Sequence, residues 1–294
     1  MRARARGRAR VGVVGADSVT ALAAVLRAAA EGFAWPVLVG EERRIRELAL
    51  ERDLDVSAVD WVPTETPERA AEAAAALAGA GELDMLLKGS LRTDQLLRAV
   101  LERRHGLRTG RLLSDVLVYE DTLSGRKRLV GVTDGGINPA PDAAGLKQIA
   151  ANAVELFRLL GCARPKVALL SATEAVTESV ASTVVARRIQ EEAAELGECE
   201  VAGPLALDNA LLPEAARAKG IGGPVAGQAD ILVVANIEAG NILGKSVKYF
   251  GGSITAHVVV GARVPVLIPS RVESEADKVH SIALGVLAAG ELTA

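Results

Sequence analysis

The chain has 294 residues, a net charge of −3, two cysteines and three histidines. This length suits about two domains, and the near-neutral charge balance argues against a nucleic acid or an acidic membrane surface as a partner. Half of the residues are apolar but only 2% are aromatic, so we expect a core of Ala, Val, Leu and Ile. Such a core is typical of parallel strands that are covered on both faces by Ala-rich helices.

The cysteines, the histidines and the apolar runs narrow the class of protein further. Cys162 and Cys199 fit no CxxC or zinc spacing, which favours a reducing compartment, here the cytoplasm, over a disulfide framework. The histidines are too dispersed for a recognisable metal cluster. No run of eighteen apolar residues predicts a membrane-spanning helix. The five arginines among residues 2–10 lack the apolar segment of a signal peptide, so we expect a short solvated tail.

In the first half of the chain, short apolar strands alternate with helices. Strands are predicted over residues 10–14, 36–39, 58–62 and 83–87. Helices are predicted from a cap at residue 17 or 18 to 30, over 41–52 and 67–78, and from a cap at 93 to 103. Two further strands, 112–119 and 128–132, follow without a helix between them, and the turn residues 121–125 predict an antiparallel hairpin.

The segment 138–142 contains two prolines and is the clearest break in the chain. After it, Asp142 is expected to cap a long helix that ends near residue 160. Further strands are predicted over 166–170, 200–202, 231–234 and 255–260, helices over 177–196 and 239–249, and a last strand and helix from 264 onward. The pattern predicts an α/β protein with mixed sheets. We expect a discontinuous first domain, residues 1–138 with 265–294, and a second domain, residues 139–264.

The sequence Pro269-Ser270-Arg271, followed by Asp277, is the strongest candidate for a functional site. It lies between the last predicted strand and the last helix, and ligands of open α/β folds bind at that end of a strand. A hydroxyl, a guanidinium and a carboxylate suit phosphate chemistry, because they supply a donor for developing charge, a fixed cation for anionic oxygens and a proton acceptor. The alternative is a capped helix start, with Ser270 or Ser274 as the N-cap.

Other strand ends in the first half carry polar residues as well. Lys88-Gly89-Ser90 ends the fourth predicted strand, and the N-terminus of the next helix, with Thr93, offers donors to an anion. Arg98 lies further along that helix, and Arg108 lies on a loop between two glycines. Binding and solvation are equally compatible with these two arginines. Gly12-Val13-Val14-Gly15 is half of a dinucleotide-binding pattern, and a tight turn is the better interpretation.

In the second half, amides and charges crowd two strand ends. Asp208 follows an apolar loop, and Asn236, Glu238 and Asn241 share one strand-to-helix turn. Lys245 lies one helical turn beyond Asn241 on the same face. This density of polar groups around a glycine predicts an oriented binding edge. Neither cysteine has a histidine nearby in the sequence, so we predict no covalent nucleophile.

Six ordered sequence blocks together resemble the phosphate acetyl/butyryltransferase family, and the wording of three of them is closer to the butyryl branch. The resemblance covers nearly the whole chain from Asp84 onward. The blocks are LLKGSLRTDQLLRAV, GLRTGRLLSDV, VTDGGINPAPD, GPLALDNA, ADILVVANIEAGNILGKSVKYF and PSRVESEADKVHSIALGVL. The resemblance implies the two-domain fold of isocitrate and isopropylmalate dehydrogenases, with an interdomain active-site cleft, and a homodimer or larger assembly.

The resemblance further implies a reversible reaction of acyl-CoA, butyryl or acetyl, with inorganic phosphate to give acyl phosphate and CoA. The transfer would be direct, in a ternary complex, so CoA is a substrate or product and no tightly bound cofactor is expected. Ser270 matches the serine that stabilises the transition state, and Arg271 matches the arginine that holds the phosphate. Asp277 matches the carboxylate that takes the proton from the CoA thiol.

Further residues match the family's pattern at its binding positions. Arg98 matches an arginine associated with CoA or phosphate binding. A second arginine of this kind has three candidates, Arg108, Arg126 and Arg128. Residues in shared motifs that we assign to substrate binding are Lys88, Asp208, Asn241 and Lys245. No metal ligand is assigned, and the glycines Gly135, Gly136 and Gly244 depart from the family's pattern and are expected to loosen the site.

Two alternatives belong to other classes of protein. A metal- and NAD-dependent decarboxylating dehydrogenase of the same fold would place two aspartates one helical turn apart, and the chain has no Asp pair at i, i+4. A non-catalytic CoA-binding regulator would have kept the fold and lost the chemistry. The intact set of Ser270, Arg271 and Asp277 argues against that second alternative.

Overall fold

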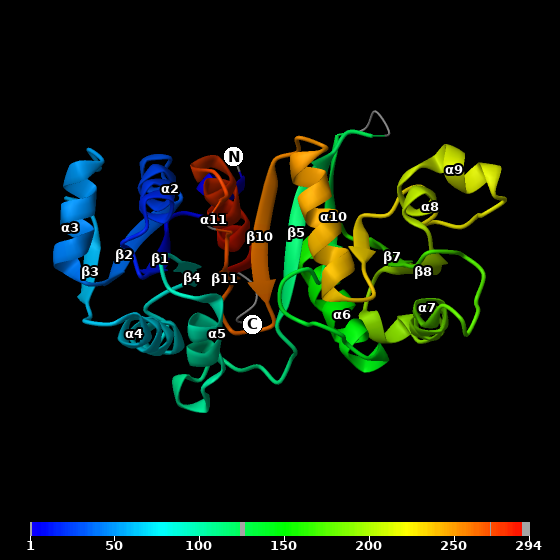
Figure 1. The fold of residues 1–294 in the computed structure, drawn as a ribbon, viewed down its shortest axis with the longest axis horizontal. Coiled ribbons are helices and arrows are strands. Elements are labelled where there is room, and N and C mark those ends of the chain that lie inside the picture. The colour runs from blue at the N-terminus through cyan, green and yellow to red at the C-terminus, as the bar shows by residue number, and fades with distance from the viewer. Residues whose placement is uncertain (1, 124–126, 271, 290–294) are drawn as a thin grey trace. The chain divides into compact units, whose positions relative to one another are not determined.

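Strands alternate with helices along almost the whole chain, as the composition predicts (Figure 1). The computed structural model describes residues 2–123, 127–270 and 272–289. Their contacts divide the chain into two units, residues Met1–Arg111 with Ala256–Ala294, and residues Leu112–Thr255. In the described part of the chain, no helix has both the length and the apolar character needed to cross a membrane.

The sheet of the first unit has the strand order β3-β2-β1-β4-β11-β10. Its strands are β1 (Ala9–Val14), β2 (Ala34–Gly40), β3 (Asp60–Pro63), β4 (Met85–Lys88), β10 (Thr255–Val260) and β11 (Val266–Leu267). Neighbouring strands from β3 to β11 are parallel, and β10 pairs with β11 in the antiparallel direction. The chain leaves β1 towards β2 on one side and reaches β4 on the other. The carboxyl ends of β1 and β4 therefore mark a topological switch point, the usual ligand site of such sheets.

Helices cover both faces of this sheet (Figure 1). They are α1 (Arg2–Ala5), α2 (Val19–Ala30), α3 (Glu42–Glu51), α4 (Pro67–Gly79), α5 (Thr93–Leu101) and α11 (Glu275–Ala289), with a 3-10 helix at Arg103–His105. Helix α11 packs against α2, and α4 against α5. Thr66 caps α4 by accepting the Arg69 N–H at 3.2 Å, and Pro67 occupies the first helical position. The helices bury mainly Ala against strand Val and Leu side chains, as expected from the composition.

The sheet of the second unit has the strand order β5-β6-β9-β7-β8. Its strands are β5 (Ser114–Asp121), β6 (Arg128–Thr133), β7 (Lys166–Leu170), β8 (Glu200–Leu205) and β9 (Ile231–Val233). The predicted antiparallel hairpin is confirmed by the pairing of β5 with β6, and residues 124–126 of its turn lie outside the described residues. The remaining pairs are parallel.

The helices predicted after residue 142, over 177–196 and over 239–249 are found with somewhat different bounds, and two short helices occupy residues 207–218, where the sequence predicts a loop. The helices of the second unit are α6 (Ala143–Leu159), α7 (Ala181–Glu191), α8 (Leu207–Leu211), α9 (Pro213–Ala218) and α10 (Ile237–Tyr249), with a 3-10 helix at Ala193–Leu196. The predicted cap at Asp142 is confirmed, because its side chain accepts the Gly145 N–H at 2.8 Å. The α/β class with mixed sheets is likewise confirmed.

The contacts group two strand pairs differently from the domain boundaries that the sequence predicts at 138 and 264. The β5–β6 hairpin belongs to the second unit, because β6 pairs in parallel with β9. Strand β10 lies almost wholly in the first unit, because it pairs with β11. The β6–β9 pairing joins segments that are far apart in the sequence, so the proline-rich break at 138–142 does not mark it. Strands β10 and β11 follow each other closely in the sequence, and the boundary predicted at 264 falls between them.

The segment near the N-terminus is solvated as expected, since Arg2, Arg4, Arg6 and Arg8 are exposed, but it is not a free tail. Arg4 pairs with Glu31 at 2.8 Å. Arg10 lies in β1, where its Nη2 is 2.9 Å from Asp60 Oδ2 and its Nε donates to the Glu82 carbonyl oxygen at 2.7 Å. The segment is therefore bound to the first unit by charge pairs.

Candidate active site

Three neighbouring parallel strands of the first unit bring their carboxyl ends to one edge. Strand β1 pairs with β4, and β4 with β11. Asp17 follows β1, Lys88 is the last residue of β4, and Ser270 follows β11. The structure thus gathers three polar side chains, from segments far apart in the sequence, at the edge where such sheets bind ligands.

Backbone hydrogen bonds fix the loops after β1 and β4 against each other. The N–H groups of Gly89 and Ser90 donate to the carbonyl oxygens of Val14 and Gly15, each at 2.8 Å. The Ser90 hydroxyl also donates to Asp17 Oδ1 at 2.5 Å. A Cβ at Gly89 would lie 1.9 Å from the Gly15 carbonyl oxygen, so only glycine permits this approach.

Lys88 is buried at the end of β4, with 6% of its surface exposed. Its Nζ lies 3.4 Å from the Gly89 carbonyl oxygen and 3.3 Å from that of Leu91, both within donating distance. A buried ammonium is costly unless acceptors surround it, and these carbonyls belong to the same loop that Gly89 anchors. Lys88 therefore supplies a fixed positive charge below the loop.

Ser270 and Asp277 lie close in the chain around the start of α11. Ser274 and Asp277 form a reciprocal cap: the Ser274 hydroxyl donates to Asp277 Oδ2 at 2.5 Å, and the Asp277 N–H donates to the Ser274 oxygen at 3.2 Å. Asp277 is 7% exposed and Ser270 is half-buried. The capped-start interpretation therefore holds with Ser274 as the cap, and the catalytic roles of Ser270 and Asp277 stay predictions. Arg271, the predicted phosphate ligand, lies outside the described residues.

Two buried charged residues at this segment were missed from the sequence. Lys278 is 2% exposed, and its Nζ donates to the carbonyl oxygens of Ser270 at 3.0 Å and Glu273 at 2.8 Å. Glu273 is 7% exposed, and its Oε1 accepts the Ser270 N–H at 3.0 Å. His257 of β10 places its Nε2 3.7 Å from the same Glu273 oxygen. The only sequence signal was Glu273 three residues after Ser270, the spacing of a capping pair.

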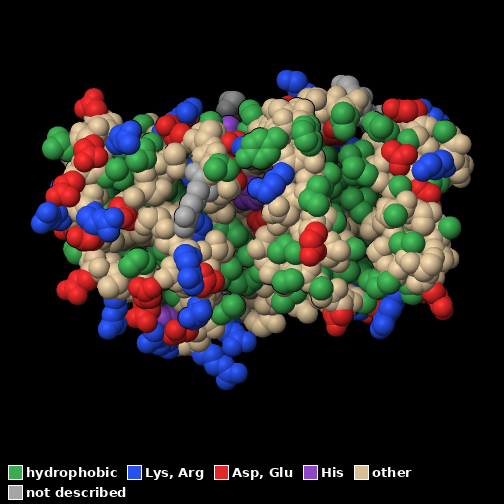
Figure 2. All heavy atoms as spheres, viewed as in Figure 1, with side chains coloured by type: hydrophobic (Ala, Val, Ile, Leu, Met, Phe, Trp, Pro, Cys, Tyr) green, Lys and Arg blue, Asp and Glu red, His purple; other side chains and the backbone are tan. Residues whose placement is uncertain are grey.

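The predicted arginines of the first unit lie on its surface. Arg98 is exposed on α5, with its Nη2 3.9 Å from Asp94 Oδ2. Arg108 is exposed on a loop that is tied down by its neighbour Thr109, whose hydroxyl donates to the Gly261 carbonyl oxygen at 2.5 Å. Figure 2 shows Lys and Arg side chains gathered over α5 and the segment that follows it.

The other two candidates for the second arginine differ from Arg108. Arg128 is mostly buried, and its Nε donates to Asp121 Oδ2 at 3.0 Å across the β5–β6 hairpin. Asp121 is 1% exposed, so this pair neutralises a buried carboxylate. Arg126 lies outside the described residues.

In the second unit, Asp134 organises the loop that follows β6. Its carboxylate accepts the N–H groups of Gly136 at 2.8 Å, Ile137 at 3.0 Å and Asn138 at 3.1 Å, and the Asn138 side-chain amide at 2.5 Å. Burial, and next the charge of Asp115, raise the pKa of Asp134 above its ordinary value, while those hydrogen bonds oppose the shift. The carboxylate therefore holds the loop shape at an electrostatic cost.

Gly135 and Gly244, which depart from the family's pattern, permit close packing, and this corrects the expectation that they loosen the site. A Cβ at Gly135 would lie 2.9 Å from the Gly240 carbonyl carbon, and one at Gly240 would lie 2.5 Å from the Asp134 carbonyl oxygen. A Cβ at Gly244 would lie 2.8 Å from a Leu117 methyl group. The loop after β6 thus lies directly against the first turn of α10.

The predicted residues of α10 stand near this contact. Asn236 caps the helix by accepting the Ala239 N–H at 2.9 Å. Asn241 donates to the Gly135 carbonyl oxygen at 3.3 Å, and Lys245 is exposed one turn further along. Asp208 lies elsewhere, after β8, where Lys219 Nζ is 3.5 Å from its Oδ2. The structure joins Asn241 with the loop after β6 and gives Asp208 a local ion pair.

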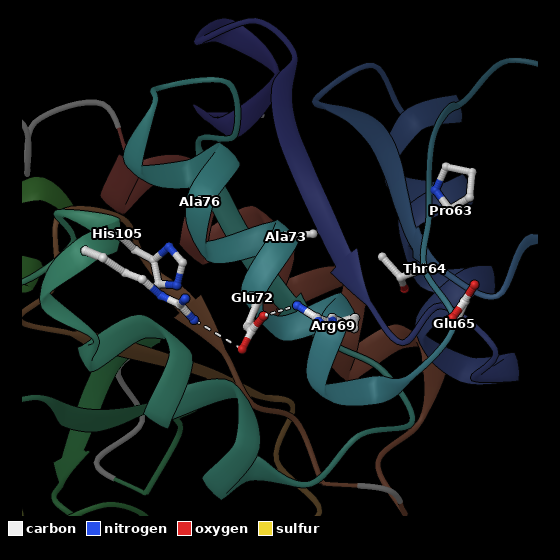
Figure 3. A pocket seen from close by; sticks show the side chains of 9 residues that line it. Pro63, Thr64, Glu65, Arg69, Glu72, Ala73, Ala76 and His105 are labelled. Carbon is white, nitrogen blue, oxygen red and sulfur yellow. Dashed lines mark hydrogen bonds and ion pairs between the residues drawn. The ribbon is translucent and has the colours of Figure 1, made fainter.

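Two pockets lie within single units. One, of about 560 Å³, lies between the end of β3, α4 and the 3-10 helix, where Glu72 bridges Arg104 at 3.1 Å and Arg69 at 3.2 Å (Figure 3). Its charges balance, and none of the predicted site residues lines it. The other, of about 420 Å³, is mainly apolar and lies past the ends of β7 and β9 beside Asn236. In residues 2–123, 127–270 and 272–289, no three His, Cys, Asp or Glu side chains are grouped to hold a metal ion.

Comparisons with known proteins agree along most of the chain. A family model described as "Phosphate acetyl/butaryl transferase" matches residues 67–286. The chain is 40% identical over 271 residues to a phosphate acetyltransferase of Rhizobium meliloti, covering 91% of this chain and 85% of that protein. It is 38% identical over 282 residues to a phosphate butyryltransferase of Clostridium beijerinckii, covering 95% of this chain and 93% of that protein.

Solved structures give the same result for the fold. A branched-chain phosphotransacylase from Enterococcus faecalis matches with a TM-score of 0.86 and 31% identity, over 96% of this chain and 99% of that one. A 4-hydroxythreonine-4-phosphate dehydrogenase from Klebsiella pneumoniae matches with a TM-score of 0.53 at 13% identity, over 96% of this chain and 98% of that one. The second likeness concerns the fold alone, and it agrees with the predicted dehydrogenase-like architecture.

Proposed function

Because the chain belongs to the phosphate acetyl/butyryltransferase family, we propose that it converts an acyl-CoA and inorganic phosphate into acyl phosphate and CoA, reversibly. The observation that carries the proposal is the family match over residues 67–286, which includes Lys88, Ser270 and Asp277. Relatives named for acetyl and for butyryl transfer are about equally similar. The proposed acyl group is therefore a short chain, butyryl or acetyl.

The proposed reaction is a direct displacement at the thioester. A phosphate oxygen attacks the carbonyl carbon, a tetrahedral oxyanion forms, the C–S bond breaks, and the CoA sulfur leaves and takes up a proton. Ser270 donates its hydroxyl hydrogen to the developing oxyanion, a type of contact that lowers the barrier by a few kcal/mol when the donor is preorganised. The hydrogen bonds to both backbone polar atoms of Ser270 support such preorganisation.

Asp277 is the proposed proton acceptor when CoA attacks acyl phosphate. Its Oδ2 is held by the Ser274 hydroxyl and N–H, so the carboxylate has a fixed orientation before substrate arrives. General acid or base catalysis of this kind contributes roughly 10²–10⁴-fold. We therefore propose that Asp277→Ala lowers kcat chiefly, while Arg271→Gln raises the KM for phosphate as well.

The remaining assignments concern substrate binding. Arg98 is exposed on α5 and Arg108 on the loop that follows it. The Lys and Arg side chains gathered over this segment (Figure 2) suit the phosphate groups of CoA. Lys88 adds a fixed positive charge at the end of β4. In the second unit we assign Asn241, Lys245 and Asp208 to substrate binding, with the local pair between Asp208 and Lys219 as a competing contact.

The proposal includes three further points about the working protein. The protein needs no tightly bound cofactor, because CoA is only a substrate or product, and the protein acts in the cytoplasm. It forms a homodimer or larger assembly, which exposed apolar side chains on and just after α10 support; these are Ile242, Tyr249, Phe250 and Ile254. Light scattering of the purified protein would give the assembly size directly.

One assay tests the proposed function. Phosphate-dependent release of CoA is measured from acetyl-, propionyl-, butyryl- and longer acyl-CoAs, and we expect the fastest turnover with a short chain. Inactivity with every acyl-CoA would refute the proposal. Measurable CoA binding without turnover would favour a regulator, and NAD reduction with a hydroxy acid and Mg²⁺ would favour a dehydrogenase.

A further inference from the structure

Ser270 lies on a segment whose backbone is held by charged side chains. Its N–H donates to the Glu273 carboxylate at 3.0 Å, and its carbonyl oxygen accepts Lys278 Nζ at 3.0 Å. The same Lys278 Nζ donates to the Glu273 carbonyl oxygen at 2.8 Å. The Lys278 ammonium group therefore holds the backbone at two points, Ser270 and Glu273.

We propose that Glu273 and Lys278 are positioning residues that fix Ser270 for transition-state contact. This inference rests on the proposed function. It adds two residues that act on the reaction through Ser270 without touching the substrate.

The burial of both residues favours positioning over a purely local structural role. Glu273 is 7% exposed and Lys278 is 2% exposed, and removing two charges from water is expensive unless they gain close partners. A turn before a helix can be closed by neutral caps, as Thr66 closes the start of α4. Two buried charges on one serine backbone therefore indicate that its position is tightly constrained.

The packing around the segment limits how far this arrangement can relax. The Ser281 hydroxyl, one helical turn beyond Asp277 on α11, accepts the His257 N–H of β10 at 2.9 Å. The His257 ring lies 3.7 Å from Glu273. Because α11 and β10 are joined in this way, α11 resists a shift of Lys278 along with Ser270. Losing the Lys278 ammonium takes one donor from the Glu273 carbonyl oxygen and leaves the Ser270 carbonyl oxygen with the Glu273 N–H at 3.2 Å.

The test compares kcat and KM of folded variants with those of the wild-type protein. Lys278→Met keeps the buried stem and removes the ammonium. Glu273→Leu removes the acceptor of the Ser270 N–H, while Glu273→Gln retains one oxygen that can accept it. We expect Lys278→Met and Glu273→Leu to lower kcat by about 10–100-fold with KM nearly unchanged, since small misplacements of a reacting group cost about that much. Glu273→Gln should retain more activity than Glu273→Leu.

A double-mutant cycle separates positioning from general damage. Ser270→Ala removes the hydroxyl, so adding Lys278→Met to it should cause little further loss of kcat. Two control variants remove charges elsewhere and should leave kcat unchanged. Glu275→Gln removes the ion pair between Glu275 of α11 and Arg27 of α2, which lie 3.5 Å apart. Lys147→Met removes the ion pairs of Lys147 with Glu192 and Glu195 in the second unit.

The outcomes distinguish failure of this inference from failure of the proposed function. A wild-type protein without phosphate-dependent CoA release refutes the function and the inference together. An active wild type with Lys278→Met and Glu273→Leu within twofold of its kcat overturns the inference alone. A full additional loss on the Ser270→Ala background also overturns it. If Lys278→Met does not fold, the Glu273 pair of variants decides the question.

Discussion

Ser274→Ala would test whether the cap of α11 also orients Asp277. The substitution removes the hydroxyl that donates to Asp277 Oδ2 at 2.5 Å and accepts the Asp277 N–H at 3.2 Å. Loss of an N-cap costs about 1 kcal/mol, which corresponds to a fall in melting temperature of about 2 °C in a chain of this size. Freed from its hydroxyl partner, the carboxylate would lose part of the general-base contribution, and we expect kcat in the CoA-acylating direction to fall about 10-fold.

Thr66→Ala is the matched control for this substitution. Thr66 caps α4 with a similar bond to Arg69, at 3.2 Å, and lies away from the segment around Ser270. Both variants should lose similar stability in calorimetric melting, but only Ser274→Ala should lose turnover. If Ser274→Ala melts like Thr66→Ala and keeps its full kcat, the hydroxyl is a cap alone and the orientation argument for Asp277 is wrong.

Three further predictions follow from the packing and the titrating groups. Gly89→Ala forces a Cβ to within 1.9 Å of the Gly15 carbonyl oxygen, so we expect the free energy of unfolding, measured with denaturant, to fall by about 1–3 kcal/mol or more. Gly222→Ala is the control, because a Cβ there has nothing within 4 Å. Equal stability of the two variants would contradict the close approach. Because burial and Asp115 raise the pKa of folded Asp134, the stability linked to this group is present below pH 3.8 and is lost as pH rises through the raised value. The stability of wild type relative to Asp134→Asn should accordingly be greater at pH 4 than at pH 7, and a constant difference would argue against the shift. Burial and the charge of Asp230 raise the pKa of Cys162 to about 11, so roughly 10⁻³ of the thiol is ionised at pH 8. A thiol reagent should therefore label Cys162 fast only after unfolding. Rapid labelling of Cys162 in the native protein would refute this prediction.

Strand ends were the part of the site that the sequence could predict. Apolar runs followed at once by Lys88 or by Ser270 indicate buried strands that stop at polar residues, and parallel neighbours bring such ends together. The cap at Asp142 and the β5–β6 hairpin follow from equally local signals.

Long-range contacts decided what the sequence could not predict. Lys278 and Glu273 resemble ordinary solvated charges at a helix start, and their burial depends on packing against segments such as α2 and β10. The domain boundaries depend on β6 pairing with β9, about a hundred residues later. The ion pair of Asp208 with Lys219, just after α9, was likewise beyond what the sequence could predict.

The discontinuity of the first unit has a consequence for the order in which the protein is made. Residues 1–111 leave the ribosome before the whole of the second unit, and the unit is completed only by residues 256–294. At 5–20 residues per second, the half-built sheet waits on the order of 10 s with the β4 edge that β11 will occupy unpaired. Ser270 and Asp277 arrive with that last segment. The chemistry proposed for this chain therefore becomes possible only after β11 and the start of α11 have been made. A nascent chain cut short before β11 would hold most of the described fold and neither of these two side chains.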